Sequence, residues 1–246
     1  MTRQSKKDGT ERRTGAAELS EEAAGILRVV VERQAYRQLM SANIRGHGLK
    51  FVPSIEQKAV LSEDLVHSLK IYSQVEQLYH SLGGSDLHDE VRSRMESIPY
   101  PSSRLEFSVC LVLCDLAERV ASRSYVDSVS KEFAAIARSL LEMNHVSTPV
   151  GADLFVEYAC DSANLPHARQ MFDRWFEITL RSLGRPGTKR DDRAVELGLR
   201  STHCGDKITE FVEEVRKFLA PTQLTLPNPE ALGLDLPAAL FASEAS

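Results

Sequence analysis

Apolar residues recur along most of this 246-residue chain at the three- and four-residue spacing of amphipathic helices. Polar breaks and clusters of proline or glycine divide that pattern into separate helices, and no segment shows the strict alternation typical of a strand. The predicted helices cover residues 23–44, 55–82, 86–97, 105–122, 128–145, 165–183 and 191–218. The sequence therefore predicts an all-α protein.

The first of these helices has recognisable ends. It is expected to begin after Ser20, because Glu21 and Glu22 favour the positive N-terminal end of a helix. It is expected to end at Ile44, since the segment Arg45-Gly46-His47-Gly48 interrupts the pattern. Its predicted inward positions include Ile26, Val29, Val30, Gln34 and Leu39.

The helix over residues 105–122 is apolar on nearly all sides between Phe107 and Leu116, which is typical of a buried core helix. Asp115 lies inside that apolar run. A buried carboxylate is costly unless it has a cation, a hydrogen-bond donor or a proton. The same argument applies to Glu32, which follows Val29-Val30-Val31.

Two short motifs, Asp64-Leu65-Val66-His67 and Glu142-Met143-Asn144-His145, each place a carboxylate and an imidazole three residues apart. Residues at this spacing lie on one face of a helix and can reach one point. Glu32 precedes Asp64 by 32 residues, and Asp115 precedes Glu142 by 27 residues, each on the preceding long helix. This order is the ligand pattern of ferritin-like di-iron carboxylate proteins.

The candidate metal ligands are Glu32, Asp64, His67, Asp115, Glu142 and His145. Carboxylates and imidazoles without thiolates suit iron or manganese. Glu118, which shares a helix face with Asp115, and Glu63, which precedes Asp64, are alternatives for two of the positions. The other histidines lack a carboxylate in matching context and are interpreted as surface or structural residues: His47, His80, His88, His167 and His203.

Composition limits the classes of partner. The net charge of −5, with basic residues spread along the chain, does not favour nucleic acid, and no apolar run approaches the length of a membrane span. The polar N-terminus is not a secretory signal, and no pair among the four cysteines has CxxC spacing. We expect reduced cysteines in a cytoplasmic protein, with a disordered tail at 1–19, a helical domain at 20–220 and an extended tail at 221–246.

Several segments resemble known oxygenases. Glu32-Arg33-Gln34-Ala35-Tyr36 resembles the first ligand segment of ferritin-like oxygenases, including cyanobacterial aldehyde-deformylating oxygenases. The stretch from Lys58 to Ser73 resembles the catalytic subunit of bacterial phenylacetyl-CoA epoxidase, of the phenylacetic acid catabolic protein family. So do Arg174-Trp175-Phe176 and Leu224-Thr225-Leu226-Pro227-Asn228-Pro229, and the resemblance covers roughly residues 24–230.

The resemblance implies a ferritin-like four-helix bundle with additional C-terminal helices and a centre of two iron ions, or manganese, bound by the six residues named above. It also implies O2 as co-substrate, an organic small-molecule substrate that is a coenzyme A thioester or a specialised metabolite, and monooxygenation or epoxidation. Electrons would come from a separate reductase, and the chain would form a homo-oligomer or pair with a related subunit.

One departure leaves a second function open. Position 64 carries Asp where the pattern has Glu, so the carboxylate reaches one methylene less far. A ferritin-like protein that keeps the fold without redox turnover, as a non-catalytic subunit or scaffold of an oxygenase complex, is therefore the alternative to a di-iron oxygenase.

Overall fold

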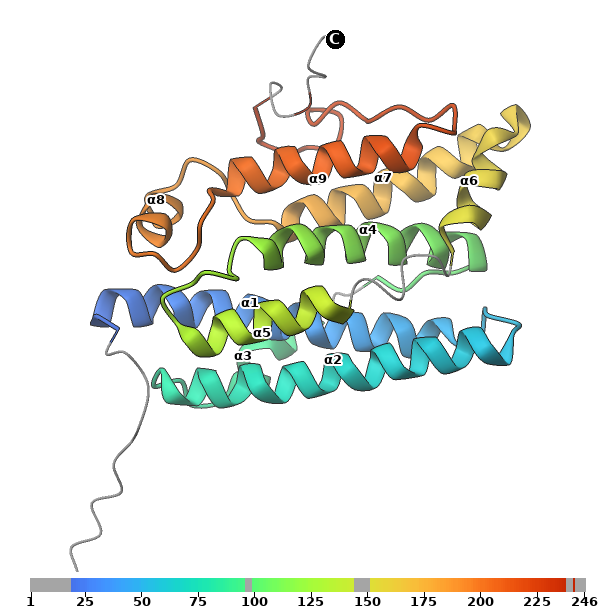
Figure 1. Cartoon of the computed structure of the whole chain (residues 1–246). Helices are drawn as coiled ribbons and strands as arrows, with labels where there is room; N and C mark the ends of the chain where they lie inside the picture. The colour runs from blue at the N-terminus through green and yellow to red at the C-terminus, as the bar shows by residue number, and fades with distance from the viewer. Residues whose placement is uncertain (1–18, 96–98, 144–150, 238–240, 242–246) are drawn as a thin grey trace, which may run out of the picture.

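The structure is a computed structural model and describes residues 19–95, 99–143, 151–237 and 241 (Figure 1). Every regular element in these residues is helical, which confirms the all-α prediction. The elements in chain order are α1 (Glu21–Gly48), α2 (Ile55–Ser81), α3 (Leu87–Met95), α4 (Arg104–Arg123), α5 (Lys131–Met143), α6 (Ala152–Cys160), the short 3₁₀ helix η1 (Ser162–Asn164), α7 (Leu165–Ser182), α8 (Lys189–Glu196) and α9 (Cys204–Leu219). Within the described part of the chain, no helix is both long and apolar enough to cross a bilayer.

Four helices contact one another in a ring. The long helices α1 and α2 run antiparallel along most of their length, joined by a short connection. On the other side, α5 packs against α2 and against α4, and α4 contacts α1 (Figure 1). The interior of this ring is where the predicted ligands were expected to meet.

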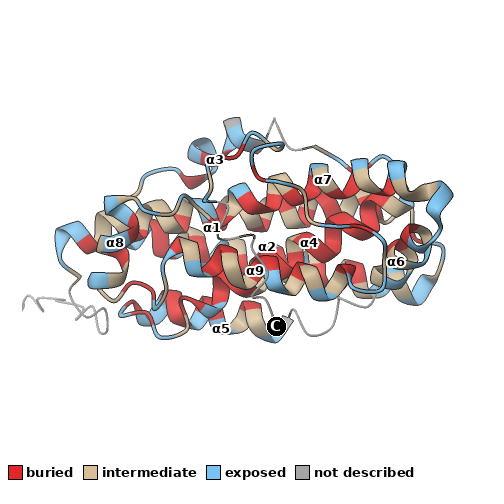
Figure 2. Ribbon diagram, turned by 90° about the horizontal axis from the view of Figure 1, so that it is seen from above, coloured by how far each residue is buried: buried red, intermediate tan, exposed pale blue. Residues whose placement is uncertain are grey.

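A second layer covers the opposite side of α4. Helices α6, α7 and α9 pack against α4 and lie above it in Figure 1, whereas α2 and α3 lie at the far side of the molecule. The helix α4 is thus sandwiched between the two layers and is buried along most of its length (Figure 2). This confirms the prediction that the apolar run from Phe107 to Leu116 is a core helix.

Serine caps begin the three long helices α1, α2 and α4. Ser20, Ser54 and Ser103 each accept a hydrogen bond from the backbone N–H three residues further on, at 3.1–3.3 Å. Each cap satisfies one of the backbone donors that a helix leaves free in its first turn. Gly83, with φ of +82°, follows the end of α2 in the left-handed conformation that glycine favours.

The prediction that the first helix ends at Ile44 is wrong, because α1 continues to Gly48. Gly48 lies against the ring of Phe107 on α4, and any side chain there would overlap that ring. The glycine therefore marks a close approach between helices rather than a helix end. As a consequence, Arg45 belongs to the helix and lies in the interior with 2 % of its surface exposed.

Replacing Gly48 with alanine should destabilise the fold by about 1–3 kcal/mol, because Phe107 is buried and has no room to move away. The matched control is Gly25→Ala on the same helix, where an added Cβ meets no neighbour within 4 Å. That change should stabilise by about 0.5–1 kcal/mol through helix propensity. Urea denaturation followed by circular dichroism measures both, and equal effects would contradict the close approach.

Two further details differ from expectation. The segment 191–218 is not one helix, since α8 ends at Glu196 and α9 begins at Cys204. Gly198, with φ of +67°, turns the chain between them, and its carbonyl accepts a hydrogen bond from Val129 N at 2.9 Å. On α1 the predicted inward positions are only half-buried apart from Gln34, and the fully buried apolar side chains include Leu27, Val31 and Ala35.

Of the two predicted tails, the structure describes most of the C-terminal one and almost none of the N-terminal one. Positions 1–18, expected to be disordered, lie outside the described residues. Residues 221–237 follow α9 as turns and irregular chain, and Leu224 and Leu234 are buried against the core. Residues 221–237 therefore pack on the helices rather than extend away from them.

Candidate functional site

A buried arginine lies where α1, α2 and α4 meet. Arg45 Nη2 donates a hydrogen bond to Asp115 Oδ1 at 2.6 Å, and Arg45 Nε lies 3.8 Å from Asp64 Oδ2. The exposed fractions are 2 % for Arg45, 5 % for Asp64 and 3 % for Asp115. The structure thus brings two of the six predicted ligands together, and a guanidinium lies between them.

The carboxylates of Asp115 and Asp64 stabilise the positive charge of Arg45. Burial by itself disfavours the charged guanidinium, but Asp115 and Asp64 outweigh that effect and raise the pKa of Arg45 above its ordinary value. A guanidinium stays protonated at any physiological pH. The cation that the sequence predicted for buried Asp115 is therefore supplied by the chain itself.

The other side chains around Arg45 are small and polar. Arg45 Nη1 donates a hydrogen bond to Ser41 Oγ, and Ser41 Oγ lies 3.2 Å from Ser68 Oγ on α2. Gln38, one turn before Ser41 on α1, is 1 % exposed. Hydroxyl and amide groups of this kind complete a hydrogen-bond network around an ion pair but are weak ligands for iron.

His67 lies close to this centre on α2. Its Nε2 is buried and has no hydrogen-bond partner among the described residues. Burial lowers the pKa of His67 and Lys70 lowers it further, whereas Asp64 and Glu142 act in the opposite direction. His67 is thus neutral at physiological pH, with one ring nitrogen available to a donor or a metal.

Glu32 lies at a different level of the helices. The hydroxyl of Tyr79 on α2 donates a hydrogen bond to Glu32 Oε1 at 3.5 Å. Tyr79 follows Asp64 by fifteen residues on α2, a separation of about 22 Å at the rise of an α-helix. The structure therefore does not bring Glu32 together with Asp64 and Asp115.

Of the second acid-x-x-His motif, the structure describes Glu142 and Met143, which end α5. Glu142 is exposed, although it is near enough to His67 to influence its pKa. His145 lies outside the described residues.

The alternative ligands have other roles. Glu118 Oε1 accepts a hydrogen bond from Gln34 Nε2 at 2.8 Å, and Glu118 Oε2 lies 3.2 Å from Arg37 Nε. Glu63 is exposed on α2. Glu118 therefore belongs to a second arginine–carboxylate pair between α1 and α4, two turns away from Arg45 along α1.

The described residues do not fit a two-iron centre held by the six predicted ligands. The space between Asp64 and Asp115 holds a guanidinium, and Glu32 lies several helical turns away. A divalent metal between these carboxylates would face a fixed positive charge at short range.

Comparison with known proteins does not indicate a family. No family model matches the chain, and a search of curated proteins finds no significantly similar sequence.

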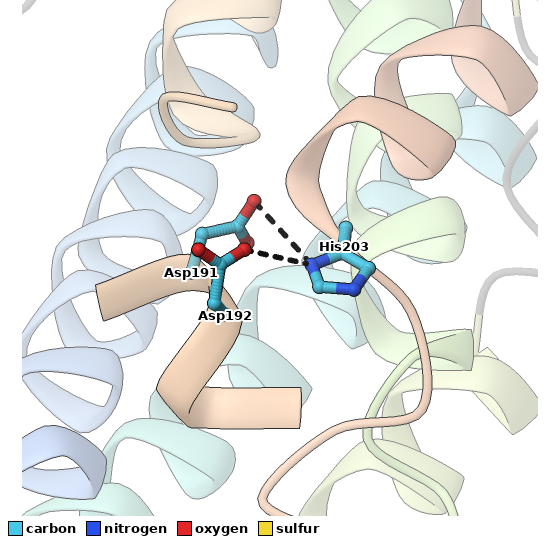
Figure 3. A group of neighbouring side chains, drawn as sticks. All are labelled: Asp191, Asp192 and His203. Carbon is cyan, nitrogen blue, oxygen red and sulfur yellow. Dashed lines mark ion pairs between the residues drawn. The ribbon is translucent and has the colours of Figure 1, made fainter. Parts of the chain in front are cut away.

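A different cluster has metal-ligand geometry. Among the described residues, Asp191, Asp192 and His203 offer ligand atoms that all lie within 4.8 Å of one another (Figure 3). His203 Nδ1 is 3.6 Å from Asp192 Oδ1 and 3.8 Å from Asp191 Oδ2. The sequence analysis missed this cluster, because the histidine lies on the loop before α9 and the carboxylates on α8.

Asp191 already has strong partners. Its carboxylate pairs with the guanidinium of Arg200 and accepts a hydrogen bond from Cys204 N at 3.0 Å. It is 3 % exposed, whereas Asp192 and His203 are exposed. This arrangement fastens α8 to the start of α9, and its role is structural.

Sequence reasoning also missed Arg45. The signal was present, because Arg45 follows Gln38 by seven residues and Gln34 by eleven, which keeps the three on one helix face. The glycines at positions 46 and 48 concealed it by suggesting that the helix had already ended.

All four cysteines are free thiols, as predicted. Cys110 is buried on α4, and burial together with the hydrogen bond that its thiol makes to Cys114 raises its pKa well above the ordinary value. A protonated, buried thiol is a poor nucleophile and behaves as a small apolar side chain.

Proposed function

We propose that this chain is a ferritin-like helical protein that acts as a non-catalytic subunit or scaffold, with an arginine–carboxylate centre in place of a di-iron site. The observation that carries the proposal is the buried guanidinium of Arg45 between Asp64 and Asp115. A fixed cation at this point supplies the charge balance that a metal would otherwise give.

The helix arrangement supports the ferritin-like part of the proposal. Ferritin-like bundles contain two antiparallel helix pairs linked by one long crossover. In this chain α1 with α2 and α4 with α5 form two such pairs, and the connection between them carries α3. The helices α6, α7 and α9 are then the additional C-terminal elements.

An exposed apolar face supports the subunit part. Ile55, Val66 and Leu69 on α2 are 79 %, 48 % and 44 % exposed. Their spacings of eleven and three residues place them along one face of the helix. Val66 and Leu69 lie one turn apart, and neighbouring exposed apolar side chains of this kind are suited to a protein–protein contact.

Metal analysis tests the proposal. Protein reconstituted with Fe²⁺ and desalted should hold far less than one iron per chain by elemental analysis. The positive charge of Arg45 beside Asp64 and Asp115 repels a metal ion from these carboxylates. The control is the Asp115→Asn variant, which should give the same low value. About two irons per chain in the natural protein, lost in that variant, would overturn the proposal.

A di-iron oxygenase is the second candidate, favoured by the buried Nε2 of His67, which has no hydrogen-bond partner among the described residues, beside Asp64. It requires iron, O2, an organic substrate and an electron-donating reductase. In that case His67→Ala would lower the iron content, and iron-loaded protein with a reductase would consume O2. Unchanged, low iron in His67→Ala would count against this candidate.

A further inference from the structure

A cavity of about 470 Å³ lies beside the first half of α1, away from the Arg45 centre. The loop between α7 and α8, α8 itself and the start of α9 form its other walls. Ile26, Val29 and Val30 give one wall an apolar surface. The rest of the lining contains five arginines and Lys207 against a single carboxylate, Asp191, which pairs with Arg200.

Lys207 is a buried lysine in the wall of this cavity. It lines this cavity from α9, is only 4 % exposed, and no carboxylate in the described part of the chain pairs with it. Its Nζ lies 5.6 Å from the centre of the Tyr125 ring, which gives partial compensation for the charge. Burial lowers the pKa of Lys207, and the positive charges of Arg200 and Arg37 lower it further, while Tyr125 and Cys204 oppose them.

The arginines around the cavity add to this charge. Arg33, Arg185 and Arg190 line the same cavity, and none of them has an ion pair with a described residue. Arg200 and Arg37 also line it but are paired with Asp191 and Glu118. Four cationic side chains without a carboxylate partner among the described residues therefore line one cavity in a chain whose net charge is −5: the buried Lys207 and three exposed arginines.

A second cavity, of about 750 Å³, borders the first. The two share Arg33, Arg37, Ser182 and Arg185 in their walls. The second also has apolar lining from side chains of α1, α7 and the C-terminal segment, including Tyr36, Ile178 and Leu236. We refer to the two together as the basic cleft, whose larger part combines these apolar side chains with Arg94, Arg181 and Asp235.

We propose that this cleft binds a small organic diphosphate, whose anionic group lies against Lys207 and the unpaired arginines and whose remainder lies in the larger cavity. A carboxylate brings one negative charge, whereas each phosphate brings between one and two at neutral pH. Four uncompensated cations match the diphosphate better, and arginine geometry suits phosphate oxygens. The site is independent of the Arg45 centre and of the proposed subunit role.

Isothermal titration of the full chain with inorganic pyrophosphate at constant ionic strength is the first test. We expect saturable binding at one site per chain, weakened on the order of thirtyfold by Lys207→Met. The matched control is Lys189→Met, an exposed lysine on α8 that does not line the cavity and should leave the affinity unchanged. No saturable binding, or equal weakening in both variants, would overturn the site.

The melting temperature of the Lys207→Met variant distinguishes a binding role of Lys207 from a structural one. Because Lys207→Met removes a buried charge without a carboxylate partner, the variant should melt no lower than the natural protein in the absence of ligand. A variant that melts markedly lower would mean that Lys207 is structural, and the proposal would fail.

Further titrations separate the sources of the anion. ADP, as an organic diphosphate, should bind more tightly than pyrophosphate, because its nucleoside adds contact in the larger cavity, and orthophosphate should bind more weakly than both. Equal affinities for ADP and pyrophosphate would overturn the organic part of the proposal and assign the site to inorganic phosphates.

Discussion

Replacing Arg45 with methionine should lower the free energy of unfolding by about 3–5 kcal/mol, the range found when one partner of a buried ion pair is removed. Methionine fills much of the same volume but leaves Asp64 and Asp115 without the guanidinium at the meeting point of three helices. The expected loss is measured as a shift of the urea midpoint at constant slope.

Two controls isolate the buried charge in this experiment. Arg123→Met removes an arginine that is 47 % exposed and paired with Glu210, and it should cost no more than about 1 kcal/mol. The triple variant with Arg45→Met, Asp64→Asn and Asp115→Asn should recover part of the loss, since the two buried carboxylate charges are removed together with the guanidinium. An Arg45→Met protein as stable as the natural one would show that the guanidinium does not hold the helices together.

Asp191→Asn should be similarly damaging, with an expected loss of about 3–5 kcal/mol. Asp191 is buried, pairs with Arg200 and accepts a hydrogen bond from Cys204 N at the first turn of α9. The amide would leave the Arg200 guanidinium buried without its carboxylate. Hydrogen exchange should show the loss first in α8 and the beginning of α9.

The neighbouring Asp192 provides the control for this second prediction. It is exposed, and Asp192 Oδ1 lies 3.6 Å from His203 Nδ1. Asp192→Asn should therefore change stability by no more than about 0.5 kcal/mol. Equal losses from Asp191→Asn and Asp192→Asn would contradict the structural role given to Asp191 and would favour a shared ligand at this cluster.

The two arginine–carboxylate centres have different structural roles. Arg45 joins α1 to α2 and α4 inside the ring of helices, whereas Arg200 and Asp191 join α8 to α9 at one end of the molecule. In both places a buried arginine side chain lies against a buried carboxylate. Such pairs contribute little over an apolar replacement, but losing one partner is costly.

The sequence by itself determined that the chain is helical and where most of the helices lie, although its apolar pattern did not predict α6 and misplaced the buried face of α1. Local signals were sufficient for this, because serine caps, glycine ends and three-to-four spacing act within a few residues. The core helix around Asp115 and the need of that carboxylate for a cation were also readable, since an apolar run on all sides leaves no face for water.

Only the tertiary structure decided which cation Asp115 receives. The spacing of the acid-x-x-His motifs determines which side chains share a face of one helix. It does not determine how far two packed helices are shifted along their axes relative to each other. The sequence alone allows Glu32 to lie near either Tyr79 or Asp64 of α2. In the structure the carboxylate of Glu32 accepts a hydrogen bond from Tyr79. Arg45 meets both Asp64 and Asp115 because α1 runs on to Gly48, whose missing side chain lets the helix approach Phe107. The basic cleft was equally hidden, since Arg33, Arg185 and Lys207 are far apart in the chain and gather only when α1, the α7–α8 loop and α9 pack together.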